Sequence, residues 1–154
     1  MDILDDLYEA ALHPQMWPSV LERLAQMVGA KGALFFSRGR HGASWTGSAK
    51  AAEDFEAYVK AGWMHEHDRA APLLERLHPG FLTDGGVYGA ARLELMSVYR
   101  DFLIPRGYPA GAGTVIQGAS QDGIILGVEG SRGRRRRQQP CRRLTKFAPT
   151  WRAP

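Results

Sequence analysis

The densest group of chemically active side chains in the sequence is the run His65-Glu66-His67-Asp68. Imidazole and carboxylate groups coordinate zinc or iron, so a metal site is the first function to weigh. Two histidines separated by one residue point to different faces of a helix, and only an extended segment would bring them together. We therefore expect a solvated helix end without metal ligands, with Asp68 as the cap of a short helix that runs to His78.

Other residues offer little for catalysis. The turn Gly111-Ala112-Gly113 leads into a strand, whereas a phosphate-binding turn leads into a helix N-terminus. The sequence contains no Gly-x-Ser-x-Gly, P-loop or His-Glu-x-x-His motif. Its one cysteine, Cys141, lies in the C-terminal segment, away from the predicted pocket. We predict that the protein is not an enzyme and has no cofactor.

The C-terminal segment is strongly basic. Residues 131–154 contain nine Lys or Arg and no acid, whereas residues 1–130 contain 11 basic and 16 acidic residues, a net charge of −5. The acidic body is a poor electrostatic match for nucleic acid. The tail could bind phosphates through a group of arginines, since cations near phosphates release counterions. These arginines are Arg134, Arg135, Arg136, Arg137, Arg142 and Arg143.

A second interpretation of residues 131–154 is an unstructured tail. Proline, glutamine and like-charge repulsion oppose the formation of a core there. Runs of Arg, Pro, Ala and Gly are also typical of a shifted reading frame in GC-rich DNA, so the segment is a candidate frameshift product. Both interpretations stay open, and both place the tail outside the folded domain of residues 1–130.

Aromatic residues are the candidates for a ligand pocket. Trp and Tyr combine a large apolar area with one hydrogen-bond donor, which suits a small amphipathic or aromatic effector. The alternative is that they are ordinary core residues. The six candidates, on the expected sheet and on the helices that cover it, are Phe35, Trp45, Tyr58, Trp63, Tyr99 and Tyr108.

Apolar periodicity predicts the helices that must position these residues. Apolar side chains recur at helical spacing over residues 2–11, 18–28, 51–63 and 93–104. The break His13-Pro14 separates the first two, which read as a helical hairpin.

Short apolar runs bounded by turn residues predict five strands. They cover residues 33–37, 43–46, 81–84, 112–117 and 124–128. The pair Asp122-Gly123 is a strong hairpin signal, whereas Gly85-Gly86 is expected to break the chain. Strands joined by hairpins favour an α/β (α+β) fold with a five-stranded, mainly antiparallel sheet covered by helices, a PAS- or GAF-like sandwich.

The overall composition is that of a soluble globular protein. Hydrophobic residues make up 44% of the 154 residues and charged residues 23%. No apolar run reaches the roughly 18 residues that a membrane span needs, and the acidic N-terminus is unlike a signal peptide. A single cysteine excludes an internal disulfide. We expect a cytoplasmic protein without a membrane partner.

Three stretches together resemble the N-terminal domain of LuxR-type bacterial transcription regulators. The resemblance covers about residues 3–130 and is strongest in residues 7–21, 77–84 and 99–108. It implies a GAF- or PAS-like domain that senses a small-molecule effector or a partner, and it implies a homodimer. DNA binding in such regulators belongs to a separate C-terminal helix-turn-helix domain.

The sequence departs from that family in two places. Family members often have Asp-Pro where this chain has Asp68-Arg69. The resemblance is therefore a weaker guide to the part of the pocket around these two residues. Nothing in residues 131–154 resembles two helices joined by a tight turn. We therefore expect a sensor domain truncated before its DNA-binding domain, which contacts DNA only through that missing domain or weakly through the tail.

Overall fold

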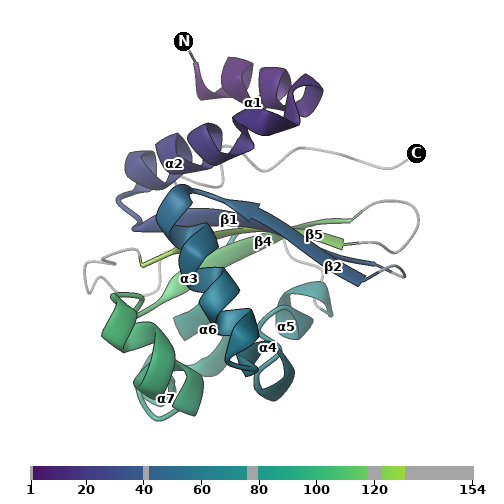
Figure 1. Cartoon of the computed structure of the whole chain (residues 1–154). Helices are drawn as coiled ribbons and strands as arrows, with labels where there is room; N and C mark the ends of the chain where they lie inside the picture. Colours follow the sequence, from purple (N-terminus) through teal and green to yellow (C-terminus); the bar gives the residue numbers. More distant parts are fainter. Residues whose placement is uncertain (1, 40–41, 76–79, 118–122, 131–154) are drawn as a thin grey trace.

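A sheet of five strands lies between two layers of helices (Figure 1). The computed structural model describes residues 2–39, 42–75, 80–117 and 123–130. The basic segment 131–154 lies outside the described residues, so the predicted domain boundary at residue 130 stays a prediction.

The sheet is antiparallel throughout. Its strands are β1 (Gly32–Gly39), β2 (Gly42–Gly47), β3 (Leu82–Thr83), β4 (Gly111–Gln117) and β5 (Gly123–Glu129). They lie in the order β2-β1-β5-β4-β3, so that the first strand pairs with the last. The predicted five strands, the antiparallel sheet and the α+β class are confirmed.

A helical hairpin covers one face of the sheet. It consists of α1 (Ile3–Leu12), the 3₁₀ turn η1 (Pro14–Met16) and α2 (Trp17–Val28). Gly29, at φ 67°, ends α2 in the left-handed conformation that favours glycine. Leu21 and Ala25 of α2 pack on Ala33 and Val128 of the two central strands. The helical hairpin predicted from the apolar stripes is therefore confirmed.

The opposite face carries one long helix and several short ones. They are α3 (Ala49–Lys60), α4 (Trp63–Glu66), α5 (Ala71–Leu74), α6 (Asp84–Tyr88), α7 (Ala90–Leu93), the π-helical η2 (Val98–Leu103) and the 3₁₀ turn η3 (Ile104–Arg106). Helix α3 sits close to β1, because a Cβ added to Gly32 would lie 2.6 Å from the Cβ of Ala51. Tyr58 and Tyr99 belong to the buried cluster of this layer.

Three predicted features of this layer are wrong. Gly62, at φ 82°, divides the helix predicted over 51–63 into α3 and α4. Gly85-Gly86 does not break the chain, because the Thr83 hydroxyl accepts the Gly86 N–H at 3.1 Å and caps α6. The helix predicted over 93–104 is interrupted, because the N–H groups of Leu95 and Met96 bond carbonyls three residues back and tighten the chain into a turn.

Two further observations bear on the expectations from the sequence. Among the described residues, no helix has the length and hydropathy that a bilayer span requires. Helix α5 ends at Leu74, and its predicted end at His78 lies outside the described residues.

Candidate functional site

A cavity of about 90 Å³ lies between the sheet and the layer of short helices. Its apolar walls come from β1, α3, α4, α5 and β5: Leu34, Phe36, Phe55, Met64, Leu73 and Ile125. A volume of this size holds several waters or one small ligand. The cavity is thus concave and mostly apolar, as ligand sites usually are.

Two glycines that face each other across β4 and β5 shape the cavity. Gly113 pairs with Gly127 in the register of the two strands. A Cβ on Gly113 would lie 2.9 Å from Cδ1 of Leu73, so this glycine lets α5 approach the sheet. A Cβ on Gly127 would lie 3.8 Å from Glu129 Oε1, an ordinary contact, and Gly127 lines the cavity, so larger side chains there would enter it.

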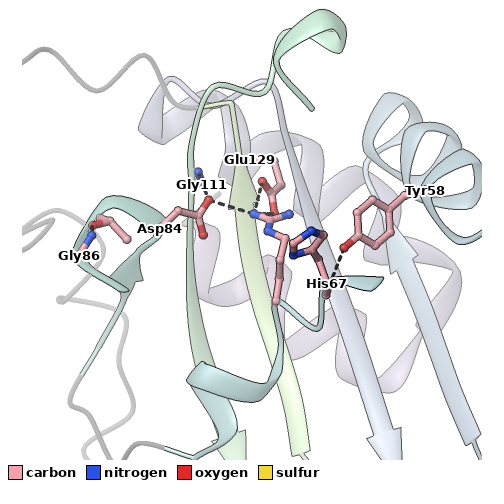
Figure 2. Close-up of polar contacts among 8 residues, drawn as sticks. Tyr58, His67, Asp84, Gly86, Gly111 and Glu129 are labelled. Carbon is pink, nitrogen blue, oxygen red and sulfur yellow. Dashed lines mark hydrogen bonds and ion pairs between the residues drawn. The ribbon is translucent and has the colours of Figure 1, made fainter. Parts of the chain in front are cut away.

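Arg69 forms a charged cluster with the carboxylates of Asp84 and Glu129 in the lining of the cavity. Figure 2 shows the Asp84 and Glu129 side chains of this cluster. Arg69 Nη2 lies 3.0 Å from Asp84 Oδ2 and 3.1 Å from Glu129 Oε2. Asp84 Oδ2 also accepts the backbone N–H of Gly111 at 2.6 Å. The cluster joins the loop before α5 to the start of α6 and the end of β5.

The side chains of this cluster are mostly withdrawn from solvent. The exposed fractions are 20% for Arg69, 15% for Asp84 and 23% for Glu129, and all three residues line the cavity. Burial raises the pKa of Glu129, and the Arg69 charge opposes that rise only in part. Burial alone would lower the pKa of Arg69, but Asp84 and Glu129 hold it well above its usual value.

A second ion pair lies at the solvent side of the cavity. Arg38 on β1 donates to Asp68 through two nitrogens, at 2.6 and 3.0 Å. The Asp68 carboxylate also accepts the N–H groups of Ala70 and Ala71, as the predicted cap of the short helix. The hydrogen bond from Arg38 lowers the pKa of Asp68. Both side chains are over one third exposed, which places this pair at the mouth.

Tyr58 connects α3 to the segment that carries these charges (Figure 2). Its hydroxyl donates to the carbonyl oxygen of His67 at 3.0 Å. His67 Nε2 in turn shares a hydrogen bond with Ser97 Oγ at 2.9 Å. Burial raises the pKa of Tyr58 to about 12, so the phenol stays protonated at neutral pH.

The structure places three of the six predicted pocket residues at or beside the cavity. Tyr58 lines it. Tyr58 and Tyr108 also line an adjoining cavity of about 40 Å³. Tyr99 lies beneath the cluster, with its ring centroid 5.5 Å from the Arg69 guanidinium carbon.

The other three predicted pocket residues lie elsewhere. Phe35 is on the opposite face of the sheet, against Trp17 at a ring distance of 4.6 Å. Trp45 is 37% exposed on β2. Trp63 packs among the buried residues around Phe102.

The charged lining was missed by reasoning from the aromatic residues. Glu129 ends the apolar strand β5 and Asp84 directly follows the short strand β3, and a carboxylate at the end of a strand was the available signal. The only sequence signal for Arg69 was that it follows Asp68 at a position where LuxR-type regulators often have proline. No group of three or more His, Cys, Asp or Glu that could hold a metal ion occurs among the described residues. Within the described lining, the residues suit binding by charge and shape, and none is Ser, Thr, Cys or Lys.

Comparison with known proteins adds a fold relationship. No protein-family model matches the sequence, and no curated protein matches it. Solved structures do match. Escherichia coli SdiA matches with a TM-score of 0.56 and 13% identity, over 96% of this chain and 56% of the SdiA chain. The chain thus spans little more than half of SdiA.

A second solved structure carries a functional description. It is CepR2 from Burkholderia cenocepacia, an N-acylhomoserine lactone dependent LuxR family transcription factor. It matches with a TM-score of 0.58 and 14% identity, over 84% of this chain and 79% of that chain. The resemblance to LuxR-type regulators seen in the sequence is therefore confirmed at the level of the fold.

Proposed function

We propose that residues 1–130 are the effector-sensing domain of a LuxR-type transcription regulator, with a small molecule bound between the sheet and the short helices. The observation that carries this proposal is the cavity. It combines apolar walls with a few convergent polar groups in a fold shared with a ligand-dependent transcription factor. We propose that the domain binds its small molecule and does not transform it.

The surroundings of the cavity explain how a bound molecule would be sensed. Helices α4, α5 and α7 have four residues each, too few to be stable alone. The segment between α4 and α5 is held by the contacts of Arg69 with Glu129 and of His67 with Tyr58. A ligand that touches β5 and α5 together would stabilise this arrangement, and binding to the folded state would raise the melting temperature.

Bulk added at Gly127 tests whether the cavity is the binding site. Gly127→Ala adds a Cβ with ordinary contacts, and Gly127→Val extends further into the cavity. We expect compounds in a small-molecule panel to raise the melting temperature of the unmodified protein and to quench its tryptophan fluorescence. The effect should weaken in Gly127→Ala and disappear in Gly127→Val.

A matched control adds bulk outside the cavity. Ala43→Val changes an exposed position on β2 that does not line the cavity, and it should leave the response unchanged. A panel without any stabilising compound would contradict the proposal. So would compounds that stabilise Gly127→Val as strongly as the unmodified protein.

A further inference from the structure

The charges that line the cavity do not balance one another. At the mouth, Arg38 and Asp68 neutralise each other. Farther in, the single guanidinium of Arg69 faces the carboxylates of Asp84 and Glu129. With these groups ionised and His67 neutral, the described lining carries one negative charge in excess. Because an unpaired charge is costly away from water, this site favours either a proton or an added cation.

The hydrogen bonds around Glu129 also leave acceptor capacity. Arg69 reaches both carboxylates through Nη2 alone, at 3.0 Å from Asp84 Oδ2 and at 3.1 and 3.2 Å from the two oxygens of Glu129. That nitrogen has two hydrogens for three oxygen atoms, while each carboxylate oxygen accepts up to two hydrogen bonds. Among the described residues, only Nη2 of Arg69 donates to the Glu129 carboxylate, so this carboxylate keeps acceptor capacity. Two buried donors at the cluster, Arg69 Nε and the Tyr99 hydroxyl, have no hydrogen-bond partner in the described part of the chain.

We propose that the effector is a small cation, in which an ammonium or similar group binds at Glu129 and Asp84. The proposal rests on the proposed function, because it names the chemical class of the molecule that the cavity senses. An ammonium group supplies three N–H donors and the missing positive charge in one group. It would stabilise the ionised form of Glu129, which burial disfavours.

The walls next to the cluster suit the rest of such a molecule. Phe55 stacks on Tyr58 with ring centroids 5.6 Å apart, and Phe36 meets Phe55 edge-on at 5.8 Å. Aromatic rings accept an apolar body and attract cations through their faces. The cavity volume of about 90 Å³ limits the buried part of the molecule to a small group.

Effectors of other charge fit this lining less well. An anion would meet the excess carboxylate, and both guanidinium groups are already paired with carboxylates of the protein. Nε of Arg69 is the one buried guanidinium nitrogen in the described lining without a hydrogen-bond partner, and a single acceptor atom on the ligand would satisfy it. A neutral molecule would leave Glu129 either protonated or unpaired. The lining of the described residues therefore discriminates by charge and not by shape alone.

Three probes of similar shape and different charge test the proposal: benzylamine, benzyl alcohol and benzoate. Binding of each to the full chain is measured by titration calorimetry at pH 7, where benzylamine is a cation. Because a charge-assisted hydrogen bond replaces a neutral one, we expect benzylammonium to bind about tenfold more tightly than benzyl alcohol. Benzoate should bind most weakly. Equal or tighter binding of the alcohol or benzoate would overturn the proposal.

Variants that remove one negative charge from the cavity lining identify the carboxylate that causes the preference for a cation. In Glu129→Gln the preference for benzylammonium over benzyl alcohol should fall to less than about twofold, because Arg69 and Asp84 then balance. Asp84→Asn should reduce the same preference and serves if Glu129→Gln does not fold. Glu53→Gln removes an exposed carboxylate of α3 and should keep the full preference. An unchanged preference in Glu129→Gln or in Asp84→Asn would overturn the proposal.

The result also separates this inference from the proposed function. If benzyl alcohol or benzoate binds best and Gly127→Val abolishes that binding, the cavity is a ligand site and the cationic class is wrong. If no probe binds, the cationic class is wrong, and the compound panel with Gly127→Val decides on the cavity itself.

Discussion

Arg69 stands between two carboxylates whose positions come from distant parts of the chain. Its removal leaves Asp84 and Glu129 side by side in a site with little solvent. We expect Arg69→Met to lower the free energy of unfolding by about 3 kcal/mol, the cost of unpaired buried charges. Urea unfolding followed by tryptophan fluorescence measures this change.

A double variant distinguishes this electrostatic effect from lost packing. In Arg69→Met combined with Glu129→Gln, one of the two repelling charges is absent, so the loss should be smaller than the sum of the single losses. Strictly additive losses would contradict the electrostatic account.

Glu129 should also make stability depend on pH. Burial raises its pKa in the folded protein above the ordinary value of 4.5, so the folded state holds the proton to higher pH than the unfolded state does. The contribution of Glu129 to stability is therefore greatest below pH 4.5 and declines as the pH rises toward the raised pKa.

A comparison with Glu129→Gln isolates this contribution. The melting temperature of the unmodified protein minus that of Glu129→Gln should fall as the pH increases from about 4.5 to 8. The melting temperature of the unmodified protein minus that of Glu53→Gln should stay nearly constant over the same pH range, because the Glu53 carboxylate is exposed. If the melting temperature of the unmodified protein minus that of Glu129→Gln rises with pH, the folded protein stabilises Glu129 as the carboxylate, which contradicts the prediction.

At the scale of elements, Asp68 joins the start of α5 to strand β1. It caps the helix through the N–H groups of Ala70 and Ala71 and pairs with Arg38. Asp68→Ala removes both interactions and should lower the free energy of unfolding by about 1–2 kcal/mol. Asp68→Asn keeps a capping oxygen and should lose less than about 1 kcal/mol. Equal losses in urea unfolding would show that the cap contributes nothing.

At the scale of the whole molecule, we expect ligand binding in the cavity not to depend on the basic segment 131–154. Every residue that lines the cavity lies between Leu34 and Glu129. We therefore expect a chain that ends at residue 130 to keep the ligand-induced rise in melting temperature. Nucleic-acid binding through the basic tail stays a prediction, and gel-shift titration at two salt concentrations tests it in the full chain and in the shortened one. Loss of the ligand response on shortening would contradict the separation.

Assembly is a second property of the whole molecule. The resemblance to LuxR-type regulators implies a homodimer, which we retain as a prediction. Sedimentation velocity of the full chain at micromolar concentration should then give the mass of two 17.0 kDa chains. A single species with the mass of one chain, with or without benzylamine, would contradict it.

The sequence by itself determined the elements whose signals are local. The apolar stripes before Gly29 predict the helical hairpin, and the Asp122-Gly123 signal predicts the antiparallel pairing of β4 with β5. Its resemblance to LuxR-type regulators also indicated the fold. Short-range signals were unreliable only in the layer of short helices, where Gly85-Gly86 lies inside α6 because a threonine caps it.

Long-range packing brings the residues of the site together. Arg69 meets Asp84 across 15 residues and Glu129 across 60 residues of chain, and no periodicity relates such positions. The pairing of β5 with β1 and β4 brings Glu129 to the cavity, and the loop before α5 brings Arg69 to it. The net charge of the cavity lining comes from side chains of several helices and strands. It is therefore set only when these elements pack together.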